Sequence, residues 1–82
     1  MKKENIELEQ IVRRLMKEFE VIRKSQGLSH AKLANLTGLH RTTIGLLEKN
    51  KRIPTIATCL KIAMALEVDL DNLISVAIKK SK

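Results

Sequence analysis

Apolar residues recur every three or four positions through most of the chain, which is the spacing that places them on one face of an α-helix. The first such stretch predicts a helix over about residues 5–25. Gly27 follows it and can take the left-handed conformation that ends a helix. The apolar positions of this helix are Leu8, Ile11, Val12, Leu15, Phe19 and Ile22.

The stretch from residue 29 to 49 predicts two short helices joined by a tight turn. Ser29 is a favourable N-cap for the first helix, which should run to about residue 36. Gly38 supplies a positive φ in the turn, and His40 occupies the cap position of the second helix, residues 41–48. The inward positions are Leu33, Ala34, Gly38, Leu39, Ile44 and Leu47. This pattern is typical of a helix-turn-helix, a motif whose second helix enters the major groove of DNA.

Two more helices follow, over residues 56–66 and 69–79. Asn50 is the residue most able to accept a left-handed conformation after the second motif helix, and Pro54 prevents its continuation. Thr55 and Asp69 are the expected N-caps. We expect the inner face of helix 56–66 to hold Ile56, Leu60, Ala63, Ala65 and Leu66. No alternating strand pattern of convincing length is present, so the prediction is an all-α chain of five helices forming one domain, residues 1–82.

The composition limits the classes of binding partner. The only aromatic residue is Phe19, which argues against RNA or single-strand binding by base stacking. The formal net charge of +7 favours a polyanionic partner, although charge alone does not separate DNA from an acidic membrane surface. No stretch is long and apolar enough to suggest a membrane span, so we expect a soluble, cytoplasmic protein.

The sequence offers no convincing catalytic or metal-binding constellation. The single cysteine, Cys59, favours a reducing compartment and is interpreted as a core or interface residue rather than a nucleophile. His30 and His40 lie ten positions apart, and the motif places no carboxylate near them. We therefore expect no enzyme activity, no cofactor and no metal.

Residues 19–74 resemble the helix-turn-helix family of the phage lambda repressor and Cro, the XRE or Cro/C1-type family. The resemblance is carried by GLSHAKLANLTGLHRTTIGLLEKNKRIPT and LKIAMALEVDLDNLI. Within that family, His40-Arg41-Thr42, Ile44-Gly45 and the run from Glu48 to Arg52 are similar to the controller proteins of restriction-modification systems. The resemblance implies a lambda-repressor-like bundle that regulates transcription as a homodimer, with helix 41–48 in the major groove of a two-fold-symmetric DNA operator.

The resemblance also implies site residues. The candidates for contacts with base edges are Arg41, Thr42 and Leu46. The candidates for contacts with the DNA backbone are Ser29, His30, Lys32, Thr43, Lys49, Lys51 and Arg52. Arg41 can donate two parallel hydrogen bonds to guanine, although it could also bond only to phosphate. Leu46 could pack on thymine methyl groups or belong to a protein interface, and His30 could equally have no role.

Two further positions have a structural interpretation. Arg23 and Glu48 match a family pair in which an arginine of the first helix bonds a glutamate at the end of the recognition helix. Gly45 inside a short helix costs about 1 kcal/mol relative to alanine. Either close approach to DNA or close helix packing would explain that cost.

The dimer surface and the first helix leave alternatives open. The expected dimer residues are Leu73, Ile74, Val76, Ala77 and Ile78, because helix 69–79 carries more apolar residues than one inward stripe holds. The front of the first helix, residues 8–15, must be covered by the last helix, by a second subunit or by another partner. The alternative function is therefore an antitoxin-like interaction protein that neutralises a partner toxin and regulates its own synthesis; a degenerate domain without DNA binding is a third.

Overall fold

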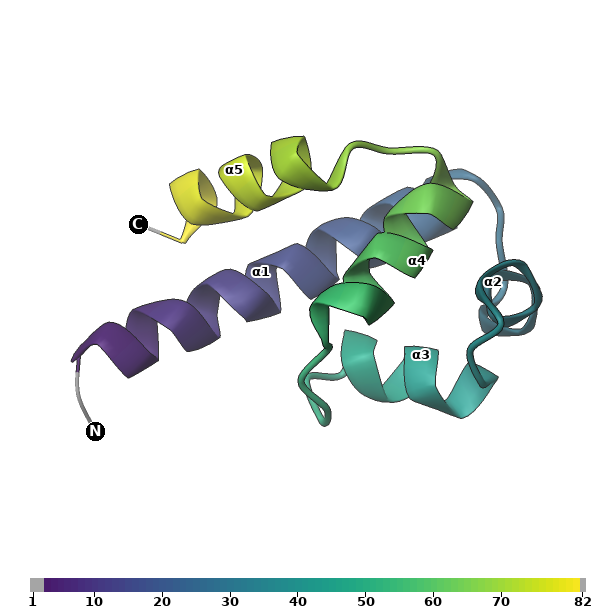
Figure 1. Cartoon of the computed structure of the whole chain (residues 1–82), viewed down its shortest axis with the longest axis horizontal. Coiled ribbons are helices and arrows are strands. Elements are labelled where there is room, and N and C mark those ends of the chain that lie inside the picture. The colour runs from purple at the N-terminus through teal and green to yellow at the C-terminus, as the bar shows by residue number, and fades with distance from the viewer. Residues whose placement is uncertain (1–2, 82) are drawn as a thin grey trace.

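A computed structural model describes the backbone of residues 3–81 and the side-chain environments of residues 7–81. This part of the chain contains five α-helices and no strand, which confirms the all-α prediction (Figure 1). The helices are α1 (Lys3–Ser25), α2 (His30–Thr37), α3 (Arg41–Glu48), α4 (Ile56–Leu66) and α5 (Leu70–Lys80). None of these helices combines the length and the apolar content that crossing a bilayer would require.

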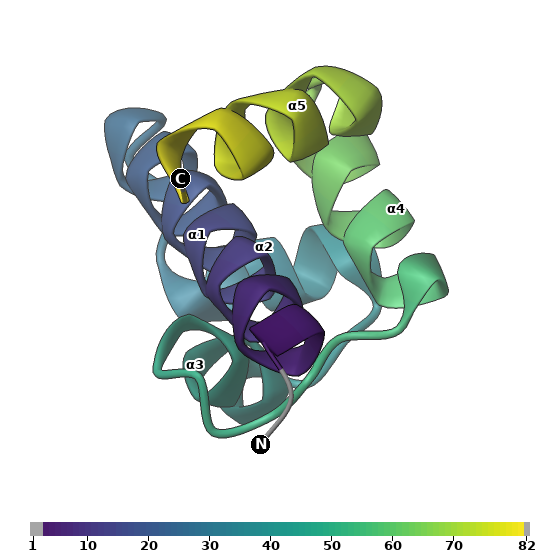
Figure 2. The ribbon, with the colours of Figure 1, turned by 90° about the vertical axis from the view of Figure 1, so that its left-hand side faces the viewer.

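The helices are arranged around α1, which runs along the long axis of the molecule (Figure 1). α5 returns beside α1 in the opposite direction, so the start of α1 and the end of α5 lie toward the same end of the molecule (Figure 1). A view along that axis shows α3 and α5 on opposite sides of α1, with α4 completing the bundle (Figure 2). The helix-turn-helix is thereby held at one edge of the molecule, away from α5.

Short polar side chains begin the helices as expected, with one exception. The Ser29 hydroxyl accepts a hydrogen bond from the Lys32 N–H at 3.0 Å, and the Thr55 hydroxyl accepts one from the Thr58 N–H at 3.1 Å. The expected capping bond of Asp69 is absent, although this residue occupies the N-cap of α5. Its carboxylate is exposed, and hydration offsets most of what a capping bond would contribute.

Three residues adopt the left-handed conformation at turns where the sequence indicated it. Gly27, Gly38 and Asn50 have φ angles of 70°, 75° and 59°. Glu67 also adopts a positive φ, of 59°, and ends α4. This conformation costs a non-glycine residue about 1–2 kcal/mol, so a glutamate at this position does not predict it from the sequence.

The core gathers the inner faces of all five helices. Its buried apolar residues are Leu15, Met16, Phe19, Leu33, Ala34, Ile44, Leu47, Cys59, Ile62, Ala63, Leu66, Leu73 and Ala77. Burial raises the pKa of the Cys59 thiol, since the low-dielectric interior disfavours its charged form. Cys59 is therefore a core residue, one of the two interpretations that the sequence allowed.

The prediction for the inner face of α4 was wrong at two positions. Ile56 and Leu60 are 66% and 46% exposed, whereas Cys59 and Ile62 are buried beside the correctly predicted Ala63 and Leu66. The buried positions 59, 62, 63 and 66 follow the helical repeat, but positions 56, 60 and 64 also form a continuous ridge. Both faces are apolar, so periodicity alone could not choose between them.

The expected dimer surface on α5 also needs correction. Leu73 and Ala77 are buried within the protomer's own core, and Ile74 packs against that core. Two of the five predicted interface residues are thus unavailable to a second subunit. The reason is that α5 uses its inward stripe to cover α1. A bond of 3.3 Å from the Lys80 ammonium to Glu18 also joins the last residue of α5 to α1.

That packing answers part of the question about the front of α1. Leu15 is buried and Ile11 packs against the core, so a second subunit is not needed to cover them. Leu8 remains 61% exposed. The uncovered part of the front of α1 is therefore shorter than the sequence indicated.

Two leucine truncations on α4 test its orientation. Leu66→Ala should lower the free energy of unfolding by about 2–5 kcal/mol, because it leaves a cavity in the core. Leu60→Ala, on the exposed ridge, should cost about 1 kcal/mol or less. Urea unfolding at two protein concentrations measures both effects and separates any contribution from dimerisation. Equal losses for the two variants would contradict this orientation.

Candidate nucleic-acid interface

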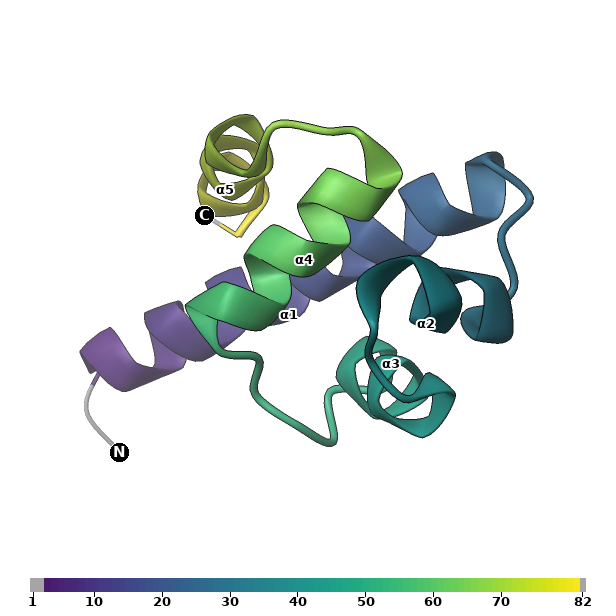
Figure 3. The same ribbon diagram turned by 45° about the vertical axis from the view of Figure 1, so that its right-hand side comes forward.

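The turn between α2 and α3 is closed by local hydrogen bonds. The Thr37 hydroxyl donates to the carbonyl of Leu33 at 2.8 Å and accepts from the N–H of Leu39 at 3.2 Å. Gly38, in its left-handed conformation, donates its N–H to Ala34 and ends α2. The two helices therefore cross closely, with α3 along the edge of the molecule (Figure 3).

The outer face of α3 presents the predicted base-contacting residues together. Arg41 and Thr42 are exposed, and Leu46 is half-buried. All three line a shallow groove of about 290 Å³, which is completed by His30, Gly45 and Lys49. The groove thus unites the base-contact candidates with two of the seven backbone-contact candidates.

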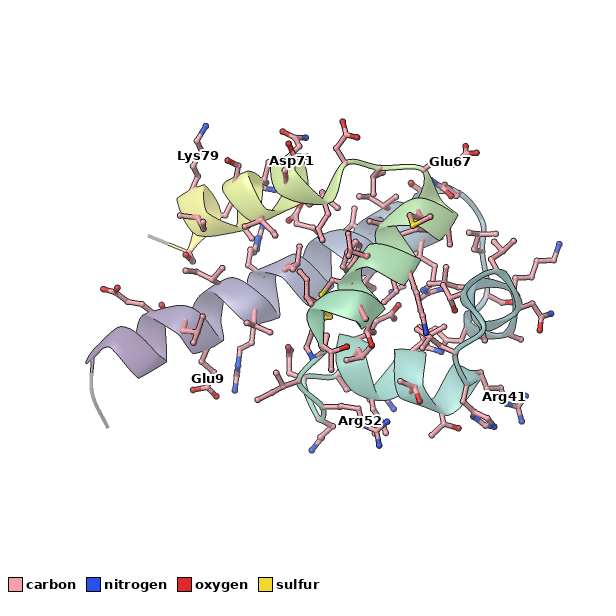
Figure 4. All side chains as sticks on the ribbon, in the orientation of Figure 1. Glu9, Arg41, Arg52, Glu67, Asp71 and Lys79 are labelled. Carbon is pink, nitrogen blue, oxygen red and sulfur yellow. The ribbon has the colours of Figure 1, made fainter. Side chains whose placement is uncertain are left out.

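The remaining backbone-contact candidates lie outside that groove. Ser29 and Lys32 are exposed at the start of α2, and Lys51 is exposed beyond the end of α3. The Arg52 guanidinium donates to the Thr43 hydroxyl at 3.4 Å. Arg41 and Arg52 lie on the same side of the molecule, near opposite ends of α3 (Figure 4).

Arg52 also borders a second, largely apolar groove. Its other lining residues are Leu8, Glu9, Val12, Arg13, Asn50 and Ile53. Arg52 therefore lines a different groove from Lys49, which lines the groove on α3.

Positive charge is concentrated around the motif. Residues 29–52 contain five lysines and arginines and a single acidic residue, Glu48. The carboxylate of Glu48 is nearly buried and faces Arg23 rather than solvent. Glu67 and Asp71, by contrast, lie on the side of the molecule opposite Arg41 and Arg52 (Figure 4). This asymmetry gives the α3 side a positive field that would attract a polyanion.

The ion pair between Arg23 and Glu48 connects α1 to the last turn of α3. The Arg23 Nε and Nη2 atoms donate to the two Glu48 carboxylate oxygens at 2.7 and 2.9 Å, and Nη1 donates to the Leu28 carbonyl at 2.7 Å. The two side chains are 8% and 9% exposed. The hydrogen bonds to Glu48 raise the pKa of Arg23, although burial opposes this effect. The pair thereby fixes where α3 ends relative to α1.

His30 joins the same cluster, which the sequence did not indicate. Its Nε2 lies 2.9 Å from Glu48 Oε1. The expectation that no carboxylate lies near this histidine was wrong, whereas its contact with the DNA backbone stays a prediction. The two residues are 18 positions apart, and only the crossing of α2 and α3 brings them together.

Gly45 is not required by helix packing. A Cβ built on Gly45 would lie 3.8 Å from the His30 ring, which is an ordinary van der Waals contact. Of the two explanations for this glycine, close helix packing therefore fails, and close approach of an external partner remains.

Two short helices joined by a glycine turn, with the second exposing a basic outer face, define a helix-turn-helix protein. The helix-turn-helix family model HTH_3 matches residues 20–73, and the chain belongs to this family. The predicted family resemblance is thereby confirmed.

Two curated relatives extend the comparison. The chain is 35% identical over 68 residues to the HTH-type transcriptional regulator SutR of Escherichia coli K12, a match that covers 83% of this chain and 38% of SutR. It is 38% identical over 53 residues to the control protein C.SmaI of Serratia marcescens, covering 65% of this chain and 63% of C.SmaI. The chain thus spans less than two thirds of either relative.

Solved structures give the same result. The restriction-modification controller protein C.AhdI of Aeromonas hydrophila is 32% identical, with a TM-score of 0.70 over 77% of this chain and 94% of C.AhdI. An HTH_3 family transcriptional regulator from Vibrio cholerae, also 32% identical, has a TM-score of 0.69 over 88% of this chain and 39% of that protein. None of the four proteins is named as an enzyme, and the narrower resemblance to controller proteins is supported.

Removing one partner of the ion pair should be costly. Glu48→Ala leaves the Arg23 guanidinium largely buried without its carboxylate, and we expect a loss of about 3–5 kcal/mol in the free energy of unfolding. The double variant Arg23→Met/Glu48→Leu should lose markedly less, because no buried charge remains. Chemical denaturation of the single and double variants measures this difference. A loss below about 1 kcal/mol for Glu48→Ala would show that the pair behaves like an exposed one.

Proposed function

We propose that the chain is a sequence-specific, double-stranded DNA-binding transcriptional regulator that places α3 in the major groove. The observation that carries this proposal is the exposed face of α3, where Arg41, Thr42 and Leu46 share one groove. Membership of the helix-turn-helix family and the positive charge around the motif support it. We expect the protein to act in the cytoplasm, and nothing in the proposed mechanism calls for catalysis.

The first residues of α3 would read base edges. The Arg41 guanidinium, exposed at the first position of α3, can donate two parallel hydrogen bonds to O6 and N7 of a guanine. Thr42 offers a methyl group to thymine and a hydroxyl to a base or phosphate. Leu46 lies one turn further on and would pack on thymine methyl groups, with Gly45 allowing the helix backbone to approach closely.

The backbone contacts would hold α3 in register from both of its ends. Ser29 and Lys32 would contact phosphates near the start of α2, and Lys49 and Lys51 would do so beyond α3. Arg52, bonded to Thr43, is directed along α3 and would clamp the backbone on the side away from Arg41.

A homodimer would bind two half-sites about one helical turn of DNA apart. We propose that its interface centres on the exposed ridge of α4, formed by Ile56, Leu60 and Met64, rather than on the inward residues of α5. Met64 is 75% exposed, and the three residues lie one above the other on one face of α4. A two-fold interface presents the same surface on both subunits, so a straight apolar ridge can pack against its own copy.

Restriction-modification control is the setting that we propose for this regulator. C.SmaI is named a control protein and C.AhdI a restriction-modification controller protein. A methyltransferase or endonuclease gene beside the gene for this chain would support that setting. None of the four similar proteins is named as an antitoxin.

DNA binding can be tested with fragments that include the region upstream of the gene. We expect binding that prefers one fragment and weakens steeply as salt increases, because basic side chains displace counterions from phosphates. Selection from a random pool would then reveal the operator and its half-site spacing. Affinity that neither depends on salt nor distinguishes any fragment would refute the proposal.

Two substitutions separate base reading from phosphate contact. Arg41→Ala should cost about 1–3 kcal/mol on the selected operator and relax preference at one position. Lys51→Ala should weaken binding to all sequences alike. Lys79→Ala, on the side of the molecule opposite Arg41, is the matched control and should change neither quantity (Figure 4). Identical effects of the first two variants on every sequence would contradict these roles.

A charge on the α4 ridge should disrupt the dimer. We expect Met64→Glu to be monomeric by sedimentation at a concentration where the wild type is dimeric, with its helical circular dichroism unchanged. Val21→Glu is the control, since Val21 is an exposed apolar residue on α1 that lies outside the ridge. A wild-type monomer, or a dimeric Met64→Glu, would contradict the proposed interface.

A further inference from the structure

His30 lies at the boundary between the Arg23–Glu48 ion pair and the groove on α3. Its Nε2 contacts Glu48 Oε1, while its side chain is 40% exposed and lines the groove with Arg41 and Lys49. One edge of the imidazole is thus bound to the protein, and the rest of the ring faces the surface where DNA is proposed to bind.

The ion pair determines which nitrogen carries the proton. The Glu48 carboxylate receives two hydrogen bonds from Arg23, so it is ionised and can only accept. Its contact with His30 therefore requires a proton on Nε2. In the neutral imidazole the other nitrogen, Nδ1, is then a hydrogen-bond acceptor.

Nδ1 lies on the groove side of the ring. It is on the edge that faces Gly45, at 3.8 Å from the position a Cβ would take there, and Gly45 itself lines the groove. A DNA phosphate oxygen is also an acceptor and cannot bond to a neutral Nδ1. Only the imidazolium, with a proton on each nitrogen, can bond to Glu48 and to a phosphate at once.

We propose that His30 contacts the DNA backbone as an imidazolium bridging Glu48 and a phosphate, so that DNA binding takes up a proton at this residue. The inference rests on the proposed DNA-binding function. It adds the protonation state in which one of the backbone contacts forms.

The charges around His30 favour this linkage. Glu48 of α3 is already neutralised by Arg23 of α1, and Arg41 and Lys49 line the groove beside the ring. The groove residues beside the ring therefore add positive charge and no negative charge. A phosphate in the groove supplies the missing negative charge, so protonation and DNA binding strengthen each other.

The direction of the pH effect follows from this linkage. The bound state holds the extra proton more firmly, so affinity is greatest below the range in which histidine titrates and falls as the pH rises through it. At full linkage the decrease is about tenfold per pH unit for each protomer.

The test is DNA affinity at constant ionic strength between about pH 6 and pH 8, across the histidine range. Wild-type affinity should fall with increasing pH. His30→Gln should show little pH dependence and bind as tightly at the upper end as at the lower, because its amide donates at every pH. His40→Asn is the matched control: it removes the other histidine but keeps an acceptor for the Thr42 N–H at the start of α3, and it should follow the wild type.

A second measurement avoids any dependence on variants that fold. The NMR signal of the His30 Cε1 proton, followed against pH, should have a higher midpoint in the DNA complex than in the free wild-type protein. Tight binding that does not change with pH, an unmoved midpoint, or a full pH dependence in His30→Gln would overturn the role of His30 alone. Absence of wild-type DNA binding at every pH would overturn the proposed function with it.

Discussion

The position of the recognition helix depends on the ion pair between Arg23 and Glu48. The pair joins α1 to the last turn of α3 through two hydrogen bonds, and a third bond ties Arg23 to the Leu28 carbonyl just before α2. One guanidinium thus connects α1, the segment before α2 and the end of α3. Since both side chains are almost buried, these hydrogen bonds exchange little with water, and they fix the last turn of α3 against α1.

This anchoring divides α3 into two functional sides. Ile44 and Leu47 pack inward, and Glu48 turns its charge toward Arg23. The outer side carries Arg41, Thr42, Gly45 and Leu46, none of which is acidic. His30 connects the two sides, because it shares Glu48 with Arg23 and also lines the outer groove. The cluster that stabilises the fold is therefore also part of the proposed DNA surface.

The two last helices differ in how much of their apolar surface the protomer buries. The inward apolar residues of α5 cover α1, and the Lys80 ammonium donates to Glu18 across the same contact. α4 buries one apolar face and leaves a second one, the ridge Ile56–Leu60–Met64, in solvent. The structure thus leaves α4, rather than α5, with an apolar face open to the second subunit that we propose.

Local patterns in the sequence were sufficient for the five helices, for their caps at Ser29 and Thr55, and for the turns at Gly27, Gly38 and Asn50, because each depends on neighbours in the chain. The outward positions of α3 were also readable, since Ile44 and Leu47 mark its inner side. Tertiary structure alone decided which face of α4 is buried, that Leu73 and Ala77 are core residues, and that His30 meets Glu48. Each of these depends on how whole helices cross, and periodicity within one helix contains no information about its neighbours.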